Sequence, residues 1–136
     1  MAALVRGPEP LRLHLSAPSL PRRLREVREQ VAAWAARLGL SNDRVDDIVL
    51  ATHEALVNVA DHAYPDGGGD AELDADCEQG EVRVVVRDHG CWQPPAADPG
   101  WRGRGLVLIG GLAEHIEVCS AAAGTSVAMH WSLPQT

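Results

Sequence analysis

A segment near the middle of the chain, HEALVNVADHAYP at residues 53–65, carries two polar side chains whose spacing could support chemistry. Glu54 and Asn58 are four residues apart, so on a helix they project in the same direction, one turn from each other. A carboxylate can accept a proton, and a neutral amide oxygen is a suitable ligand for Mg²⁺. The pair could therefore hold a metal ion and supply a base, or both residues could belong to the solvated back of a helix.

A second candidate lies where a strong β-strand pattern ends, in VVVRDHG at residues 84–90. Asp88 could accept a hydrogen bond from an amino group of a ligand, and Gly90 would let that ligand approach the backbone closely. Asp and Gly also favour ordinary turns, so the strand could equally end in a turn without further function.

The segment GWRGRGLVLIGGLAEH at residues 100–115 places Gly103 and Gly105 directly before an apolar, helix-like run. Backbone N–H groups at the start of a helix favour bound anions, and Arg102 and Arg104 add charge complementary to phosphate. The spacing fits neither the P-loop nor the GxGxxG dinucleotide pattern. A phosphate-binding segment and a flexible loop both stay open.

A last candidate is Thr125, which follows Gly124 at the start of the final strand-like segment. A hairpin turn explains both residues adequately. A hydroxyl at this place could also contact a bound ligand.

Hydrophobic periodicity predicts the elements that must position these residues. Leu alternates with polar residues at 11–17, which predicts a strand at the edge of a sheet. Helical spacing predicts one helix over 22–38 and a second that begins near residues 41–43. The second helix carries the Glu and Asn pair on the side opposite to most of its apolar residues.

The rest of the chain continues this pattern, with the following predicted elements: strands at 71–78 and 81–88 around a turn at 79–80, an irregular stretch at 89–102, a short helix at 105–115, and strands at 116–121 and 125–131. This order predicts an α+β fold, a two-layer α/β sandwich whose helices cover one face of a mixed, mostly antiparallel sheet. We expect one domain at 11–132, with tails at 1–10 and 133–136.

The bulk composition is typical of a globular protein, with 136 residues, 46% hydrophobic and 23% charged. The formal net charge of −7 disfavours direct nucleic-acid binding, which needs a basic surface. Three widely spaced cysteines form neither a zinc pattern nor a disulfide framework, which indicates a reducing cytosol. We expect a cytoplasmic protein without membrane contact, because the sequence shows neither a signal-peptide pattern nor an apolar run long enough to span a membrane.

The four motifs stand in a characteristic order: Glu-x-x-x-Asn on a helix, Asp-x-Gly after a strand, Gly-x-Gly before a helix and Gly-Thr at the last strand. This order resembles the GHKL ATPase superfamily, whose nucleotide fold is an α/β sandwich. Within it, HEALVNVADHAY and GRGLVLIGGLAEHIEV resemble the bacterial anti-sigma factor and serine-protein kinase family, which has a histidine-kinase-like ATPase domain. The resemblance covers residues 11–132.

The resemblance implies ATP and Mg²⁺ as cofactors and a role for each matching residue. Glu54 matches the general base, and Asn58 matches the Mg²⁺ ligand. Asp88 matches the carboxylate that accepts a hydrogen bond from the adenine amino group, with Gly90 beside it. The remaining matches are the segment around the phosphates, Gly103, Arg104 and Gly105, and the hydroxyl near the adenine, Thr125.

Two further residues bear on this resemblance. Trp92 stands where the family often has a second glycine, two positions after Gly90. We expect this departure to affect the affinity for nucleotide and the mobility of the lid over the nucleotide site. His62 also falls in the helix motif, where a phosphate neighbour and a structural helix-end role are both open.

The resemblance implies a serine-protein kinase that phosphorylates an anti-anti-sigma partner, sequesters a sigma factor by partner switching and forms a homodimer. One alternative is a nucleotide-binding partner-switching regulator without kinase turnover. A detached ATPase domain of a sensor histidine kinase is disfavoured, because no helical segment with a phospho-accepting His precedes the domain and the region expected to form the lid is short.

Overall fold

The computed structural model describes residues 8–64, 68–90 and 108–134. Its elements, in chain order, are β1 (Leu11–Ser16), the 3-10 turn η1 (Ala17–Ser19), α1 (Leu20–Ala36), α2 (Asn42–Asn58), the π-helical turn η2 (Val59–Ala63), β2 (Asp70–Glu78), β3 (Glu81–Asp88), β4 (His115–Ala121) and β5 (Gly124–Ser132). A short helical stretch at residues 108–112 precedes β4. This is the predicted order of strands and helices.

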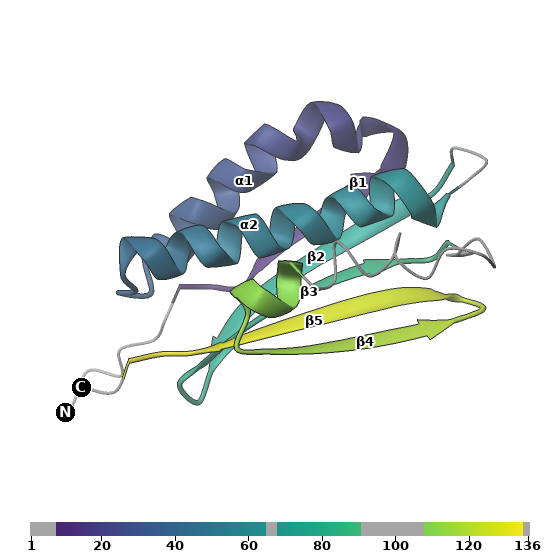
Figure 1. The fold of residues 1–136 in the computed structure, drawn as a ribbon. Helices are drawn as coiled ribbons and strands as arrows, with labels where there is room; N and C mark the ends of the chain where they lie inside the picture. Colours follow the sequence, from purple (N-terminus) through teal and green to yellow (C-terminus); the bar gives the residue numbers. More distant parts are fainter. Residues whose placement is uncertain (1–7, 65–67, 91–107, 135–136) are drawn as a thin grey trace.

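The strands form one five-stranded sheet in the order β1-β2-β3-β5-β4. Each neighbouring pair among these strands is antiparallel. Both long helices lie over the same face of this sheet (Figure 1). The predicted α+β sandwich is therefore confirmed, and β1 occupies a sheet edge as its alternating pattern predicted.

Local sequence signals explain where the two helices begin and end. Pro21 stands in the first turn of α1, where its missing N–H costs nothing. Gly39 has a φ of +77° in the turn after α1, a conformation that favours glycine. The hydroxyl of Ser41 then accepts a hydrogen bond from the backbone N–H of Arg44 at 3.2 Å, which caps the start of α2.

A tight two-residue turn joins β2 to β3 and fixes the register of this central hairpin. Gln79 and Gly80 have φ values of +52° and +75°, as the favoured hairpin turns require. The register then pairs Ala71 with Asp88 at the far end of the two strands. Asp88 therefore occupies a fixed place on the last rung of the ladder.

The core lies between the helices and the inner face of the sheet. Alternate residues of β3 point inward and are fully buried, as are Met129 and Trp131 of β5. Two tryptophans supply bulk that the absent Phe would otherwise provide: Trp34 is 5% exposed and Trp131 is 0% exposed. The helices in the described ranges are too short or too polar to cross a membrane.

Candidate functional site

Buried polar side chains mark one end of the sandwich. The described part of the chain buries four of them, namely Thr52, Asn58, Asp88 and Thr125. The Thr52 hydroxyl donates to the carbonyl of Ile48 at 2.7 Å, inside its own helix. The other three come from the end of α2, the end of β3 and the start of β5. Because burying a polar group costs free energy, this gathering indicates a site.

Asp88 is the last residue of β3 and is 3% exposed. Its Oδ1 accepts a hydrogen bond from the backbone N–H of Gly90 at 3.0 Å, which turns the chain directly after the strand. A Cβ atom added to Gly90 would lie 2.0 Å from the carbonyl oxygen of Ala63. Gly90 therefore permits a close approach between the end of β3 and the end of η2 that no other residue allows.

Thr125 pairs with Asp88 across β3 and β5 and is also 3% exposed. Its Oγ1 lies 3.2 Å from the hydroxyl oxygen of Ser120 on β4, so the two hydroxyls share a hydrogen bond. A hollow of about 310 Å³ includes all three residues in its wall. The predicted residues Asp88 and Thr125 thus lie together at one cavity.

Asn58, at the end of α2, is only 8% exposed, and its Nδ2 atom has no hydrogen-bond partner in the part of the chain that the structure describes. The expected position on the side opposite to the apolar residues is wrong. The buried positions of α2 advance in steps of three and four, through Ile48, Ala51 and Ala55, and the stripe ends on Asn58. Two small alanines let α2 pack closely, which turns the amide inward.

Glu54 lies one turn before Asn58 on α2 and is half-buried. It therefore retains contact with solvent, which a carboxylate must have if a second substrate is to reach it. The preceding residue, His53, has its Nδ1 atom 3.2 Å from the Arg28 guanidinium. Burial, and then the charge of Arg28, lowers the pKa of His53 below 6.5, and Glu54 acts in the opposite direction.

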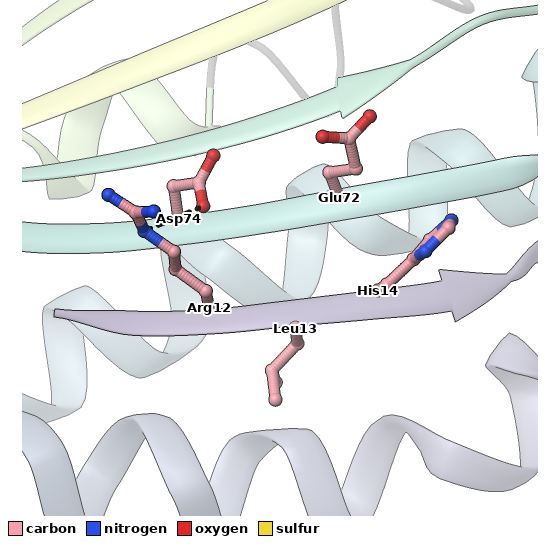
Figure 2. A pocket seen from close by; sticks show the side chains of 5 residues that line it. All are labelled: Arg12, Leu13, His14, Glu72 and Asp74. Atoms are coloured by element: carbon pink, nitrogen blue, oxygen red, sulfur yellow. Dashed lines mark ion pairs between the residues drawn. The ribbon is translucent and has the colours of Figure 1, made fainter.

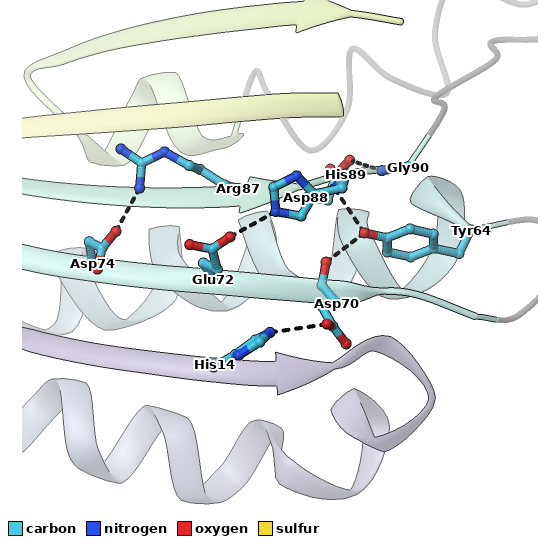
Figure 3. Close-up of polar contacts among 9 residues, drawn as sticks. All are labelled: His14, Tyr64, Asp70, Glu72, Asp74, Arg87, Asp88, His89 and Gly90. Carbon is cyan, nitrogen blue, oxygen red and sulfur yellow. Dashed lines mark hydrogen bonds and ion pairs between the residues drawn. The ribbon is translucent and has the colours of Figure 1, made fainter. Parts of the chain in front are cut away.

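The sequence interpretation missed Tyr64, which joins three segments at this end of the sandwich (Figure 3). Its hydroxyl donates to the carbonyl of Asp70 at 2.5 Å and accepts from the backbone N–H of His89 at 2.8 Å. The imidazole of His89 in turn lies 2.7 Å from a carboxylate oxygen of Glu72, a contact that Figure 3 also shows. Tyr64 is the chain's one tyrosine and stands in the same motif as Asn58, which was the available signal.

The predicted phosphate segment, Gly103, Arg104 and Gly105, lies outside the described residues. The same holds for Arg102, Trp92 and the side chain of His62. Their expected roles stay predictions.

Another hollow, of about 620 Å³, is bounded by β1 and β2 on the face of the sheet that points away from the helices (Figure 2). Arg12 and His14 point to this face, whereas Leu13 points away from it toward the helices. The ion pair between Arg12 and Asp74 is 3.8 Å long, and the Arg12 side chain is 78% exposed. This hollow is larger but has a wall of exposed, paired charges, so the smaller one at the strand ends is the better candidate.

An α/β sandwich with a buried carboxylate, hydroxyl and amide at one end defines a known class of domain. The chain belongs to the family described as the histidine kinase-like ATPase domain, which its residues 17–131 match. The match includes α2, β3 and β5, so the candidate site lies inside it.

Within this family, the chain is similar to serine-protein kinases and anti-sigma factors of bacteria. The serine-protein kinase RsbW of Halalkalibacterium halodurans is 34% identical over 82 residues, which cover 60% of this chain and 50% of that protein. The anti-sigma F factor of Clostridium acetobutylicum is 33% identical over 64 residues, covering 47% of this chain and 45% of that one. The chain therefore spans about half the length of the curated relatives that it matches.

A solved structure shows the same fold. The structure of the RsbU and RsbW domains of Rv1364c from Mycobacterium tuberculosis superimposes with a TM-score of 0.75 at 26% identity. The superposition covers 95% of this chain and 34% of that one. The predicted resemblance to anti-sigma factor kinases of the GHKL type is thus confirmed.

Proposed function

We propose that this domain binds ATP with Mg²⁺ and transfers the terminal phosphoryl group to a serine of an anti-anti-sigma partner. The observation that carries the proposal is the burial of three polar groups at one end of the sandwich, with Asp88 and Thr125 paired on neighbouring strands and Asn58 at the end of α2. The names of the relatives, serine-protein kinase and anti-sigma F factor, support the two partners, an anti-anti-sigma substrate and a sigma factor that the domain sequesters. We also propose that it acts as a homodimer in the cytoplasm.

The described residues fit an adenine nucleotide and a metal ion. The buried carboxylate of Asp88 suits an amino group of the base, with the Thr125 hydroxyl beside it. Gly90 lets the end of β3 pack directly against the backbone of Ala63 beside this site. Asn58 offers an amide whose Nδ2 has no partner within residues 8–64, 68–90 and 108–134, and an amide oxygen is a suitable Mg²⁺ ligand.

The remaining groups would stabilise the negative charge of the phosphates and accept the proton of the attacking serine. Mg²⁺ would neutralise charge on the phosphates, and Gly103, Arg104 and Gly105 would add backbone N–H groups and a guanidinium around them. Glu54 would accept the proton of the attacking serine hydroxyl as ADP leaves. What supports this role is that Glu54 is half-buried and lies one turn from Asn58.

A single substitution tests the proposed reaction. Glu54→Gln keeps the shape of the side chain but removes the base, so serine phosphorylation should fall by about a hundredfold or more. ATP binding should change little, because Glu54 does not contact the base of the nucleotide in this proposal. The measurement is phosphoserine formation on anti-anti-sigma proteins of the same genome, paired with calorimetry of ATP binding in Mg²⁺.

The wild-type protein provides the control and the decisive outcomes. Mg·ATP should raise its melting temperature, since a ligand bound to the folded state stabilises it. Binding without any phosphoserine would refute kinase turnover and leave the nucleotide-binding, partner-switching regulator. If millimolar ATP does not bind with or without Mg²⁺, both the kinase and the nucleotide-binding regulator are refuted.

A further inference from the structure

The aromatic ring of Tyr64 lies between two glycines that come from different loops. A Cβ added to Gly69 would lie 2.0 Å from the ring atom Cε1, and Gly69 has a φ of +146°. A Cβ added to Gly90 would lie 3.0 Å from the ring atom Cδ1. The ring therefore fits because both neighbours lack a side chain.

The Tyr64 hydroxyl takes the place of a rung in the sheet. The paired residues of β2 and β3 end with Ala71 and Asp88, so Asp70 and His89 would form the next pair. Instead, the hydroxyl lies between them: it donates to the Asp70 carbonyl and accepts from the His89 N–H (Figure 3). One donor and one acceptor are thus satisfied by a group that comes from the end of α2 and η2.

The other contact of His89 is a weaker constraint. Its imidazole lies 2.7 Å from Glu72, but the two side chains are 60% and 42% exposed. Exposed ion pairs contribute little, because water and salt screen them. The Tyr64 hydroxyl instead bonds the backbone of His89, and its ring is packed against two glycines. This contact restrains the residue between Asp88 and Gly90 more directly.

Three observations show that the end of β3 is held against the end of the α2–η2 segment. The ring contacts Gly90, the hydroxyl holds His89, and Ala63, the residue before Tyr64, makes the close approach to Gly90. The segment 88–90 is thereby held against the helix that carries Asn58. This segment carries Asp88, the proposed base-binding residue, and the helix carries Asn58, the proposed metal-binding residue.

We propose that Tyr64 is a positioning residue of the nucleotide site. It sets where the Asp88 carboxylate stands relative to Asn58, and so fixes the span between the base and the phosphates of a bound nucleotide. This inference rests on the proposed nucleotide binding, but it concerns a residue that need not touch the ligand. Without the hydroxyl, the end of β3 is free to shift away from the end of α2.

The test is Tyr64→Phe, which keeps the ring and removes only the bridging hydroxyl. ATP affinity should fall by about fivefold to tenfold, because the variant loses both hydrogen bonds through which the hydroxyl orders the site. GTP has no amino group at the position that Asp88 would recognise, so its weaker binding should change less, and the preference for ATP over GTP should shrink. Calorimetry with both nucleotides measures the two affinities.

Hydrogen exchange gives a readout that needs no ligand. The His89 amide is bonded to the Tyr64 hydroxyl, so its protection should be lost in the Phe variant while the Val84 and Val86 amides of β3 keep theirs. The control is Thr52→Val, which removes a buried hydroxyl of α2 that is bonded within its own helix and does not contact the end of β3 in any hydrogen bond that the structure describes. That variant should leave the ATP-to-GTP preference and the His89 amide unchanged.

The outcomes separate this inference from the proposed function. If the wild type binds ATP and Tyr64→Phe binds it with the same affinity and the same preference over GTP, the positioning role is overturned. The proposed function then stays intact. Failure of the wild type to bind ATP would overturn both, whatever the exchange data show. If Thr52→Val lost the preference for ATP over GTP as much as Tyr64→Phe does, the effect would be explained by general destabilisation, and the inference would also be overturned.

Discussion

The two faces of β3 carry polar groups under opposite conditions. On the inner face, at the end of the strand, Asp88 is 3% exposed and lies among other buried polar groups. On the outer face, the Arg87 guanidinium lies 2.6 Å from Asp74, and both side chains are more than one third exposed. The two carboxylates thus face very different free-energy costs of burial, although they stand on adjacent strands of the same sheet.

The difference separates charged pairs that stay in contact with water from polar groups that the fold buries at one end. The outer face pairs its charges in contact with water, where each pair adds little stability. The inner end buries a carboxylate, a hydroxyl and an amide whose Nδ2 has no partner among the described residues, where apolar side chains would be more stable. This cost of burial is the basis for the ligand site proposed at that end.

The largest expected effect compares the two ends of β3 through two glycines. Gly90→Ala places a Cβ 2.0 Å from a backbone carbonyl, so it should lower the free energy of unfolding by about 3 kcal/mol. Gly80→Ala, in the hairpin at the other end, meets no atom within 4 Å, and its φ of +75° should cost only about 1 kcal/mol. Urea unfolding measures both, and equal losses would contradict a tightly packed site end.

The next prediction separates stability from function at Asn58. Leu has the same branched skeleton as Asn, so Asn58→Leu removes a buried polar group without leaving a cavity. The free energy of unfolding should rise by about 1 kcal/mol in the absence of ligand, whereas Mg²⁺-dependent ATP binding should be lost. Thermal melts with and without Mg·ATP report both quantities.

Asn42 provides the matched control, because it is an exposed asparagine at the start of the same helix. Asn42→Ala should change stability by less than about 0.5 kcal/mol and leave nucleotide binding intact. A clear loss of stability in Asn58→Leu would mean that the amide is satisfied within the fold. Retained Mg²⁺-dependent binding would remove Asn58 from the metal site.

The elements with local signals were predictable from the sequence. The second helix was predicted to begin near residues 41–43, and Ser41 caps it. The turn predicted at 79–80 is present, with positive φ values at Gln79 and Gly80. The edge position of β1 followed from its alternation of Leu with polar residues. Each of these features depends on a few neighbouring residues, which is why the pattern predicted it.

Features that depend on packing between distant segments were not predictable. The burial of Asn58 depends on which face of α2 meets the sheet, and alanines at 51 and 55 widened the possible face. The role of Tyr64 depends on the register that places Asp70 and His89 next to each other. A sequence pattern contains neither the contact face nor the register, so it located the site motifs but not the bonds between them.

The smallest expected effect is the pH dependence from the outer face. The hydrogen bond from His89, and then the nearby positive charges, holds the pKa of Glu72 below its ordinary value of 4.5. A carboxyl whose pKa is lower in the folded state stabilises the fold above about pH 4.5, and this contribution is lost as the pH falls through the folded pKa.

Glu72→Gln should therefore flatten the acid side of the stability profile slightly, and 1 M salt should remove most of the difference from wild type, because both partners are exposed. Urea unfolding between pH 3 and pH 6, at low and high salt, measures the change. The His89 amide should keep its protection in this variant, because its bond to Tyr64 is independent of the imidazole. A salt-resistant loss as large as that of Gly90→Ala would show that the outer face supports the site end as strongly as the buried contacts do, and the contrast between the two faces of β3 would fail.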